Sequence, residues 1–250
     1  ARATKVIQAL DNGSATGISE SKVNQYKGEA YFMLGFAYCE LTAYYGDCVL
    51  NKGMTLDEAY VATRSPKNEV LAYAFECLDK AAEYLPNSYK GQQRPTKGAA
   101  LGFKARFALF HEDWQTAVDA AQKCMDLGVY KLHDNYREMF QATSSPEFMF
   151  YFKGDLTLKK GYGFMENVRD FVIRKIGGHC NQSPSLELFC SYTCTDGLPI
   201  DKSPLYNPKD PFANRDPRLA MTIQPFKTKY SADYAEYEQS KKDGTFPEKY

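Results

Sequence analysis

Residues 207–219, "NPKDPFANRDPRL", concentrate the acidic and basic side chains that could carry out acid–base chemistry. Asp210 and Asp216 could form the pair of carboxylates that glycoside hydrolysis usually requires. Such pairs also arise by chance in any chain, so this spacing gives catalysis little support. An anion site at the arginines or a shaped surface turn are the other readings.

The prolines of this stretch favour the turn. Proline fixes its own φ and disfavours the helical region for the residue before it, so backbone geometry constrains Asp210 and Asp216 first. Arg215 and Arg218 stand where they can pair with these carboxylates. We therefore predict that "RDPRL" anchors the loop to a helical platform, with its charges as internal ion pairs rather than ligand contacts. The prolines are Pro208, Pro211 and Pro217.

Histidine and cysteine offer little further chemistry. Residues 179–180, His-Cys, followed by Cys190 and Cys194, could be drawn as a zinc cluster because thiolate and imidazole suit that metal. No Cys-x-x-Cys pair supports it, and no serine or cysteine lies in a recognisable nucleophile turn. We predict seven reduced, mostly buried cysteines, no metal or cofactor, and no enzymatic activity. The three histidines lie in unrelated contexts, at His111, His133 and His179.

Composition narrows the class of partner. The 250 residues contain 31 Lys plus Arg and 31 Asp plus Glu, so no overall field favours nucleic acid or an anionic membrane surface. The chain has no apolar run of about 18 residues that could span a bilayer, and no signal peptide opens it. It has 19 Tyr and 16 Phe but one Trp, and tyrosine offers both an apolar face and a hydroxyl. We expect some of these rings to face a ligand or a partner.

The elements that must position these side chains begin with helices. After the tail of a helix at residues 1–10, apolar spacings of three and four predict a helix over residues 27–45 that stops at Gly46. Ser65 and Pro66 then predict the start of a second helix. The two helices carry the small and aromatic positions of a tetratricopeptide repeat. Those positions are Tyr31, Leu34, Gly35 and Tyr38 in the first helix and Ala74, Leu78, Ala81 and Pro86 in the second.

A second helical pair is predicted from Thr96, an N-cap candidate, to Gly128, with Ala105, Ala117, Ala121 and Cys124 in the small-residue positions. Most aromatic side chains of these helices should be core. Residues 46–64 form an unusually long connection between the first two helices, which favours a partner-facing loop with Tyr60 as its contact. The aromatic residues predicted to be core are Tyr31, Tyr38, Phe103, Phe107 and Trp114.

The pattern changes after Tyr130. Residues 148–154, "FMFYFKG", predict a short strand, and residues 155–182 an irregular segment rich in glycine and rings. A short helix should begin at Ser183, a turn should lie at residues 196–197, and a polar helix at residues 231–244.

Three landmarks, in order, resemble the SusD/RagB family. "GEAYFMLGFAYCELTAYYGDCVL" is similar to the family's Gly-Glu-Ala, aromatic helix and Tyr-Gly-Asp-Val-Pro-Leu, with Cys48 and Val49 in the Val and Pro positions. "RPTKGAALGFKARFALFHEDWQTAVDAAQKCMDLGVYKL" resembles its second repeat. "SPSLELFCSYTCTDGLPI" and "YNPKDPFANRDPRLAMTI" resemble its Asp-Gly-x-Pro-Ile turn and its Arg-Asp-Pro-Arg-Leu run. The structural signature is Gly46, Asp47, Asp196, Gly197, Asn207, Pro208, Arg215, Asp216, Pro217 and Arg218.

The resemblance implies a mostly α fold and a cell-surface lipoprotein of the bacterial outer membrane. Such a protein binds a polysaccharide or oligosaccharide without cleaving it and delivers it to a SusC-like TonB-dependent transporter. The family is about twice as long, so the chain resembles a fragment, and its membrane contact would be an N-terminal lipid anchor outside this chain.

Within a single SusD-like domain we expect a helical repeat platform at residues 1–130 and a loop-rich, ligand-facing region at residues 131–250. The alternative is a helical-repeat scaffold that binds a protein or peptide on its concave face. No local motif marks the sugar contacts. The candidate glycan-binding residues are Tyr60, Tyr162, Phe164, Arg169 and Tyr192.

Overall fold

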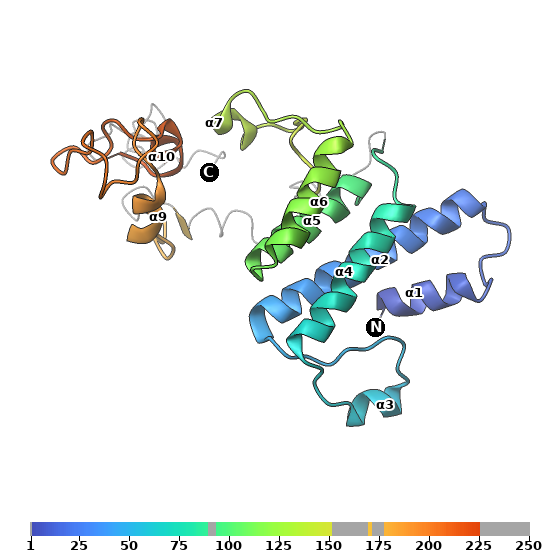
Figure 1. Cartoon of the computed structure of the whole chain (residues 1–250). Coiled ribbons are helices and arrows are strands. Elements are labelled where there is room, and N and C mark those ends of the chain that lie inside the picture. Colours follow the sequence, from blue (N-terminus) through green and yellow to red (C-terminus); the bar gives the residue numbers. More distant parts are fainter. Residues whose placement is uncertain (1, 90–93, 152–169, 172–177, 226–250) are drawn as a thin grey trace, which may run out of the picture. The chain divides into compact units, whose positions relative to one another are not determined.

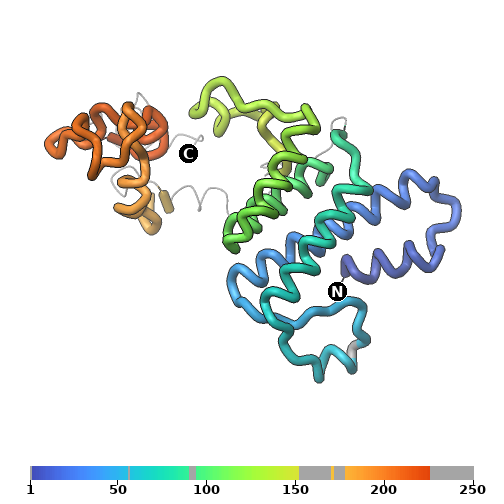
Figure 2. Tube along the Cα trace, in the orientation of Figure 1, coloured from blue at the N-terminus to red at the C-terminus, as the bar shows by residue number. Residues whose placement is uncertain are grey.

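The computed structural model of the chain describes residues 2–89, 94–151, 170–171 and 178–225. The chain divides into two compact units. The first, here the helical unit, comprises Ala1–Asp134 and Thr143–Phe152, and the second comprises Asn135–Ala142 and Lys153–Tyr250. Figures 1 and 2 show helices running alongside one another through the helical unit and short helices joined by turns in the second.

Almost all regular structure in the described residues is α-helix, as the repeat spacing predicts. The helical unit contains α1 Arg2–Asp11, α2 Glu20–Tyr45, α3 Leu56–Val61, α4 Lys67–Tyr84, α5 Lys97–Phe110 and α6 Trp114–Asp126. The second unit contains α7 Tyr136–Met139, α9 Leu186–Ser191 and α10 Pro217–Thr222.

Helices α2 and α4 of the first pair pack against each other at Gly35 of α2, which has no side chain. A β-carbon on Gly35 would lie 2.8 Å from the carbonyl oxygen of Ala74 and 2.8 Å from Cγ of Leu78. Ala74 is fully buried and Leu78 nearly so. The repeat pattern assigned small residues to these positions, and their size is what lets α2 and α4 approach closely.

In the second pair, the cap at Thr96 and the end at Gly128 are as predicted, and Asp113 adds a further cap. Oγ1 of Thr96 accepts a hydrogen bond from the backbone N–H of Ala99 at 3.1 Å and starts α5. Oδ1 of Asp113 accepts from the N–H of Thr116 at 3.2 Å and starts α6. Gly128, with φ of 62°, follows the end of α6 in the left-handed region that favours glycine.

Rings from α2, α5 and the segment after α6 form the centre of the helical unit. Phe32 is fully buried, and its ring meets Phe103 edge-on at 5.7 Å and Phe150 edge-on at 5.1 Å between centroids. Tyr38 and Phe107 are also buried, as predicted. This cluster fixes Phe150, and with it the segment of residues 143–151, against the helices.

The first residues of α2 and α4 both differ from the prediction. The helix α2 begins at Glu20, seven residues before the predicted start. Pro66, not Ser65, holds the N-cap position of α4, because Ser65 pairs with Cys48 in an antiparallel bridge. The N–H of Lys67 is satisfied from a distance in sequence, donating to Oδ1 of Asp47 at 2.8 Å.

The long connection at residues 46–64 is ordered and carries α3. Thr55 and Glu58 form a capping box at its start. The connection is held to α2 through Tyr38, whose hydroxyl accepts from the N–H of Asn51 at 2.8 Å and donates to the carbonyl of Asn51 at 3.2 Å. Gly46, with φ of 67°, ends α2 as predicted.

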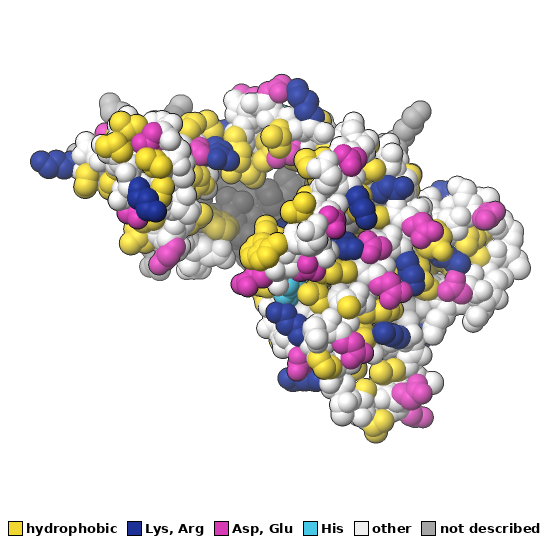
Figure 3. All heavy atoms as spheres, viewed as in Figure 1, with side chains coloured by type: hydrophobic (Ala, Val, Ile, Leu, Met, Phe, Trp, Pro, Cys, Tyr) yellow, Lys and Arg dark blue, Asp and Glu magenta, His cyan; other side chains and the backbone are white. Residues whose placement is uncertain are grey.

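Trp114 corrects the prediction that it is core. Its side chain is 59% exposed at the first position of α6, where the buried residues are Ala117, Ala120 and Cys124. Figure 3 shows hydrophobic side chains gathered at this end of the hairpin. The exposed apolar residues on α5 and α6 are Leu109, Phe110, Trp114, Val118 and Met125.

Two further expectations fail in the later part of the chain. Residues 148–151 form no strand, because the Phe150 ring packs into the helical core and the described residues include no strand beside them to pair with. The rest of that predicted strand lies outside the described residues, as does the predicted helix at residues 231–244. The short helix α9 is capped by Ser185, not Ser183, through a bond from the N–H of Leu188 at 3.1 Å.

All seven cysteines are free, and four of them are buried. Burial raises the pKa of Cys39 to about 12 and that of Cys77 to about 11, so both behave as small apolar side chains. Among the described helices, none combines the length and the apolar character needed to cross a bilayer.

Candidate functional site

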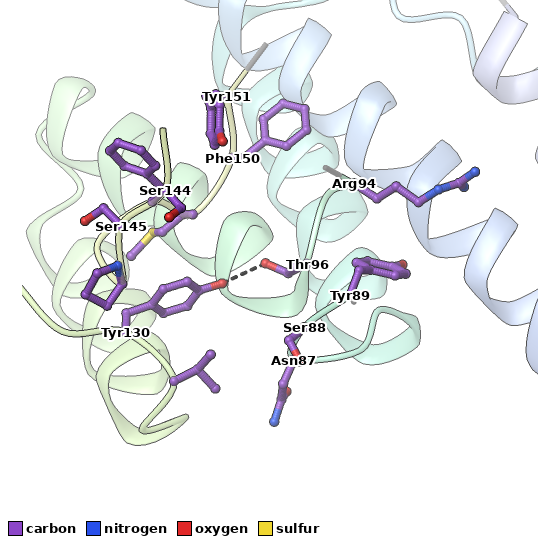
Figure 4. A pocket seen from close by; sticks show the side chains of 14 residues that line it. Asn87, Ser88, Tyr89, Arg94, Thr96, Tyr130, Ser144, Ser145, Phe150 and Tyr151 are labelled. Carbon is purple, nitrogen blue, oxygen red and sulfur yellow. Dashed lines mark hydrogen bonds between the residues drawn. The ribbon is translucent and has the colours of Figure 1, made fainter. Parts of the chain in front are cut away.

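A cleft of about 300 Å³ opens on the helical unit where three loops meet (Figure 4). One loop follows α4, one follows α6, and the third is the segment at residues 143–151. Side chains with a ring or a hydroxyl predominate in the walls. Its fourteen lining residues are Asn87, Ser88, Tyr89, Arg94, Thr96, Val129, Tyr130, Ser144, Ser145, Pro146, Phe148, Met149, Phe150 and Tyr151.

The floor of the cleft is formed by Tyr130 and Thr96, whose hydroxyl groups are hydrogen-bonded to each other. Their hydroxyl oxygens lie 2.7 Å apart, so the residue that caps α5 also orients the ring (Figure 4). The ring crosses the start of α5 over Gly98, where a β-carbon would overlap Tyr130. Gly98 is therefore required for the floor, because any larger residue would displace the ring.

The segment at residues 143–151 is held by hydrogen bonds from the backbone of Lys131 and His133. The N–H of Lys131 donates to the carbonyl of Pro146 at 3.2 Å, and the N–H of His133 donates to Oε2 of Glu147 at 2.8 Å. The ring of Tyr151 meets Phe148 edge-on at 5.1 Å. These contacts leave the rings of this wall half-buried and fixed in place.

The electrostatics of the cleft centre on one ion pair. Nη1 of Arg94 donates to both carboxylate oxygens of Glu29 on α2, at 2.8 and 2.9 Å, and this bonding raises the pKa of Arg94. Nearby, burial raises the pKa of Tyr89 to about 12. The Tyr89 hydroxyl is buried and has no hydrogen-bond partner among the described residues.

The predicted glycan-binding residues are not gathered at this cleft. Tyr60 lies on α3, is 80% exposed, and is not among the residues that line the cleft. Tyr192 lies in the second unit, where its hydroxyl donates to Oγ1 of Thr222 at 3.0 Å. Tyr162, Phe164 and Arg169 lie outside the described residues. A sugar contact by any of the five stays a prediction.

Residues 207–219 form a folded loop, and its two arginines bond different kinds of partner. Arg218 pairs with Asp216 as predicted, with Nε 3.0 Å from both carboxylate oxygens. Arg215 forms no ion pair with an aspartate among the described residues. It is buried, and it donates to the carbonyls of Phe189, Tyr192 and Pro211 at 2.7 to 3.0 Å.

Arg215 differs from the prediction because α9 and the chain after it bring carbonyls, rather than carboxylates, around the guanidinium. Its ring contacts are with Phe189 and Tyr206, at 5.0 and 5.6 Å from the centroids. All these partners lie in the second unit. Anchoring of the loop to the helical platform stays a prediction.

The other signature residues shape turns and caps. Asp196 accepts from the N–H of Leu198 at 3.0 Å, and Gly197 has φ of 81°, which confirms the predicted turn. Asn207 accepts from the N–H of Lys209 at 3.0 Å in the turn that contains Pro208. Pro217 opens α10 behind its cap, Asp216.

Metal-binding geometry is lacking in the part of the chain that the structure describes, where three or more His, Cys, Asp or Glu side chains nowhere gather. His179 lies instead with its Nδ1 3.3 Å from Oδ1 of Asp170.

The cleft residues escaped the sequence prediction for a physical reason. Tyr89, Tyr130 and Tyr151 lie in three loops and share no helical or strand spacing. One signal could have pointed to them: each follows or precedes a recognisable helix end or a cluster of Ser, Asn and Pro.

Residues 1–109 match the model of a SusD-like family described as starch-binding and associating with the outer membrane. SusD-like protein P2 of Formosa agariphila is 26% identical over 166 residues, which is 62% of this chain and 33% of that protein. A solved SusD-like carbohydrate-binding protein of Bacteroides fragilis is 26% identical with a TM-score of 0.70, over 93% of this chain and 48% of its own. Another from the same species is 25% identical with a TM-score of 0.63, over 88% and 46%.

This chain thus spans a third to a half of the length of these relatives. The solved proteins share its helical architecture over most of its residues. The family model, the relative and the solved structures agree, because each of them is SusD-like and each is similar to part or most of this chain.

Proposed function

We propose that the helical unit binds part of a polysaccharide or oligosaccharide in its cleft, without catalysis. The observation that carries this proposal is the composition of the walls, in which half-buried tyrosine rings alternate with hydroxyl and amide groups. A sugar ring presents C–H groups on its faces and hydroxyls at its edge. Rings suit the first, and Ser, Thr and Asn side chains suit the second.

The cleft is also preorganised. The Thr96 hydroxyl and Gly98 hold Tyr130 in place, while the packing of Phe150 on Phe32 and Phe103 holds the opposite wall. Side chains that are fixed before binding lose little conformational entropy when a ligand arrives. Its volume lies at the low end for ligand sites, which run from about 300 to 1,000 Å³. The cleft therefore suits a short stretch of a glycan.

The walls support binding rather than cleavage. Hydrolysis of a glycosidic bond by the usual mechanisms needs two carboxyl groups beside the bond. Asp and Glu are missing from the described residues that line the cleft. The resemblance of the relatives, named as carbohydrate-binding, agrees with this assignment.

By the same resemblance, the full-length protein acts at the bacterial cell surface. We propose that a lipid anchor outside this chain holds it at the outer membrane, and that it passes the glycan to a SusC-like TonB-dependent transporter. Co-purification with that transporter from detergent-solubilised outer membranes tests this part, and recovery without any such transporter would contradict it.

A second candidate function rests on the exposed apolar face of α5 and α6. Phe110, Trp114 and Val118 are each about 60% exposed there, and a helical-repeat scaffold would use such a face to hold a peptide or protein. Binding of a glycan at the cleft and of a protein at this face are separable by mutation.

The test of glycan binding is retardation in affinity gels that contain one polysaccharide each. Truncating Tyr151 to Ala removes a ring from the wall and should weaken binding by about tenfold, the value of roughly one aromatic contact. Tyr44→Ala is the matched control, because that ring is 78% exposed and does not line the cleft.

Two results would contradict the cleft as the site. One is retardation by no polysaccharide, which favours the scaffold function. The other is a loss on Tyr60→Ala with no change on Tyr151→Ala, which would move the site to α3.

A further inference from the structure

We infer that the cleft selects uncharged sugars and discriminates against uronic-acid and sulfated units. The inference rests on the proposed function, because it names the class of glycan that would occupy the same site. Its starting point is the side chains of the walls. Of the fourteen described residues that line the cleft, Arg94 is the one whose side chain carries a charge at neutral pH.

The charge of Arg94 is already balanced. Its guanidinium bonds both oxygens of Glu29, and Figure 4 shows the side chain extending away from the Tyr130 hydroxyl. Opposite charges in contact cancel most of each other's field a few ångströms away. An acidic sugar at Arg94 would have to approach the Glu29 carboxylate, so repulsion would offset the attraction.

The phenols of the cleft remain neutral as well. Burial raises the pKa of both Tyr89 and Tyr130 above the ordinary value for tyrosine. The hydroxyls of Tyr130, Thr96 and Ser144 can each donate and accept a hydrogen bond. Sugar hydroxyls have the same double capacity, whereas sulfate and carboxylate groups only accept. The walls therefore match an uncharged ligand in both charge and hydrogen-bonding type.

A second hollow on the same unit shows that charge is not scarce on this surface. The groove between α4, α5 and α6 is lined by eight residues, of which five are charged. They are Asp79, Glu83, Lys97, Lys123 and Asp126. The two hollows belong to one unit of one chain, so the scarcity of charge among the described lining residues distinguishes the cleft from the groove.

The test compares neutral polysaccharides, an α-glucan, a β-glucan and a galactan, with polygalacturonate and a sulfated galactan, using the whole chain. We expect a neutral polymer to bind at least about tenfold more tightly than either acidic one. Its affinity should change by less than about twofold between 50 and 500 mM NaCl, because no net charge is neutralised on binding.

A gain-of-function variant makes the test sharper. Ser144→Lys places an uncompensated cation on the exposed wall, and it should acquire salt-sensitive binding of the sulfated galactan. Ser144→Gln is the control of similar length without charge, and it should not.

The outcomes separate the two proposals. If the wild-type chain binds an acidic polymer and loses it on Arg94→Gln, the inference is overturned but glycan binding at the cleft stands. If the chain retains neither class, or retains one equally well after Tyr151→Ala, the proposed function itself fails and the inference fails with it.

Discussion

The helical unit and the second unit are each stabilised by a different kind of internal interaction. In the helical unit, small residues let helices approach closely, as Gly35 does against Ala74. Buried rings also pack against one another there, as Phe32 does against Phe150. In the described part of the second unit, three backbone carbonyls converge on one buried guanidinium, that of Arg215. Stability depends on shape in the first case and on a few directional hydrogen bonds in the second.

The largest expected effect tests the packing of the helical unit. Phe32→Ala removes a fully buried ring that contacts three others, so the free energy of unfolding should fall by about 3–5 kcal/mol in urea titrations. Phe110→Ala, at a ring that is 62% exposed, is the control and should cost far less. Equal losses for the two variants would mean that the ring cluster does not hold this unit.

The next effect tests the second unit. Arg215→Met keeps an apolar stem but leaves three carbonyls without their donor, at a cost of about 3 kcal/mol. Arg215→Lys should be nearly as harmful, because one ammonium cannot reproduce the planar fork. Arg218→Met, at an exposed side chain three residues away, should have a much smaller effect. If Arg215→Met left the free energy of unfolding unchanged, hydrogen bonds to Arg215 would not be what stabilises the second unit.

A smaller effect depends on pH. Bonding to Arg218 holds the pKa of Asp216 below its usual value in the folded protein. The stability contributed by this carboxylate is therefore present above a pH of about 4 and is lost as the pH falls through the lower, folded-state pKa. Asn at this position can still cap α10, so Asp216→Asn should destabilise more at pH 6 than at pH 2.5, in thermal unfolding at both values. A difference independent of pH would rule out the ion pair as its cause.

The smallest effect returns to the helical unit. Trp114→Ser replaces a side chain that is 59% exposed, so the free energy of unfolding should change by no more than about 0.5 kcal/mol. A much larger loss in calorimetry would show that a partner or another copy covers this face, which would favour the scaffold function.

The sequence predicted the helical unit well because its structure is periodic. Spacings of three and four assign Tyr38, Ala74 and Leu78 to buried faces, and local chemistry assigns the cap at Thr96. The same reasoning misassigned Trp114, since periodicity does not tell which face of the last helix in a stack is covered. It also could not show that the Asp47 carboxylate accepts a hydrogen bond from the backbone N–H of Lys67, twenty residues later at the start of α4.

The second unit and the cleft could not be predicted in the same detail. The partners of Arg215 are carbonyl groups, which every residue has, so no pattern of side chains marks them. The walls of the cleft come from three loops whose approach depends on tertiary packing, including the fit of Tyr130 over Gly98. A resemblance to a family supplied the fold, but the position of the site required the structure.

Hydrogen–deuterium exchange with a glycan that binds in the affinity gels tests the central claim most directly. The amides of residues 87–89, 96–99 and 143–151 should exchange more slowly when the glycan is added, while those of α3 should not change, because the ligand occupies the cleft and rigidifies its loops. Protection of α3 around Tyr60, with no change at residues 143–151, would contradict the assignment of the cleft as the binding site.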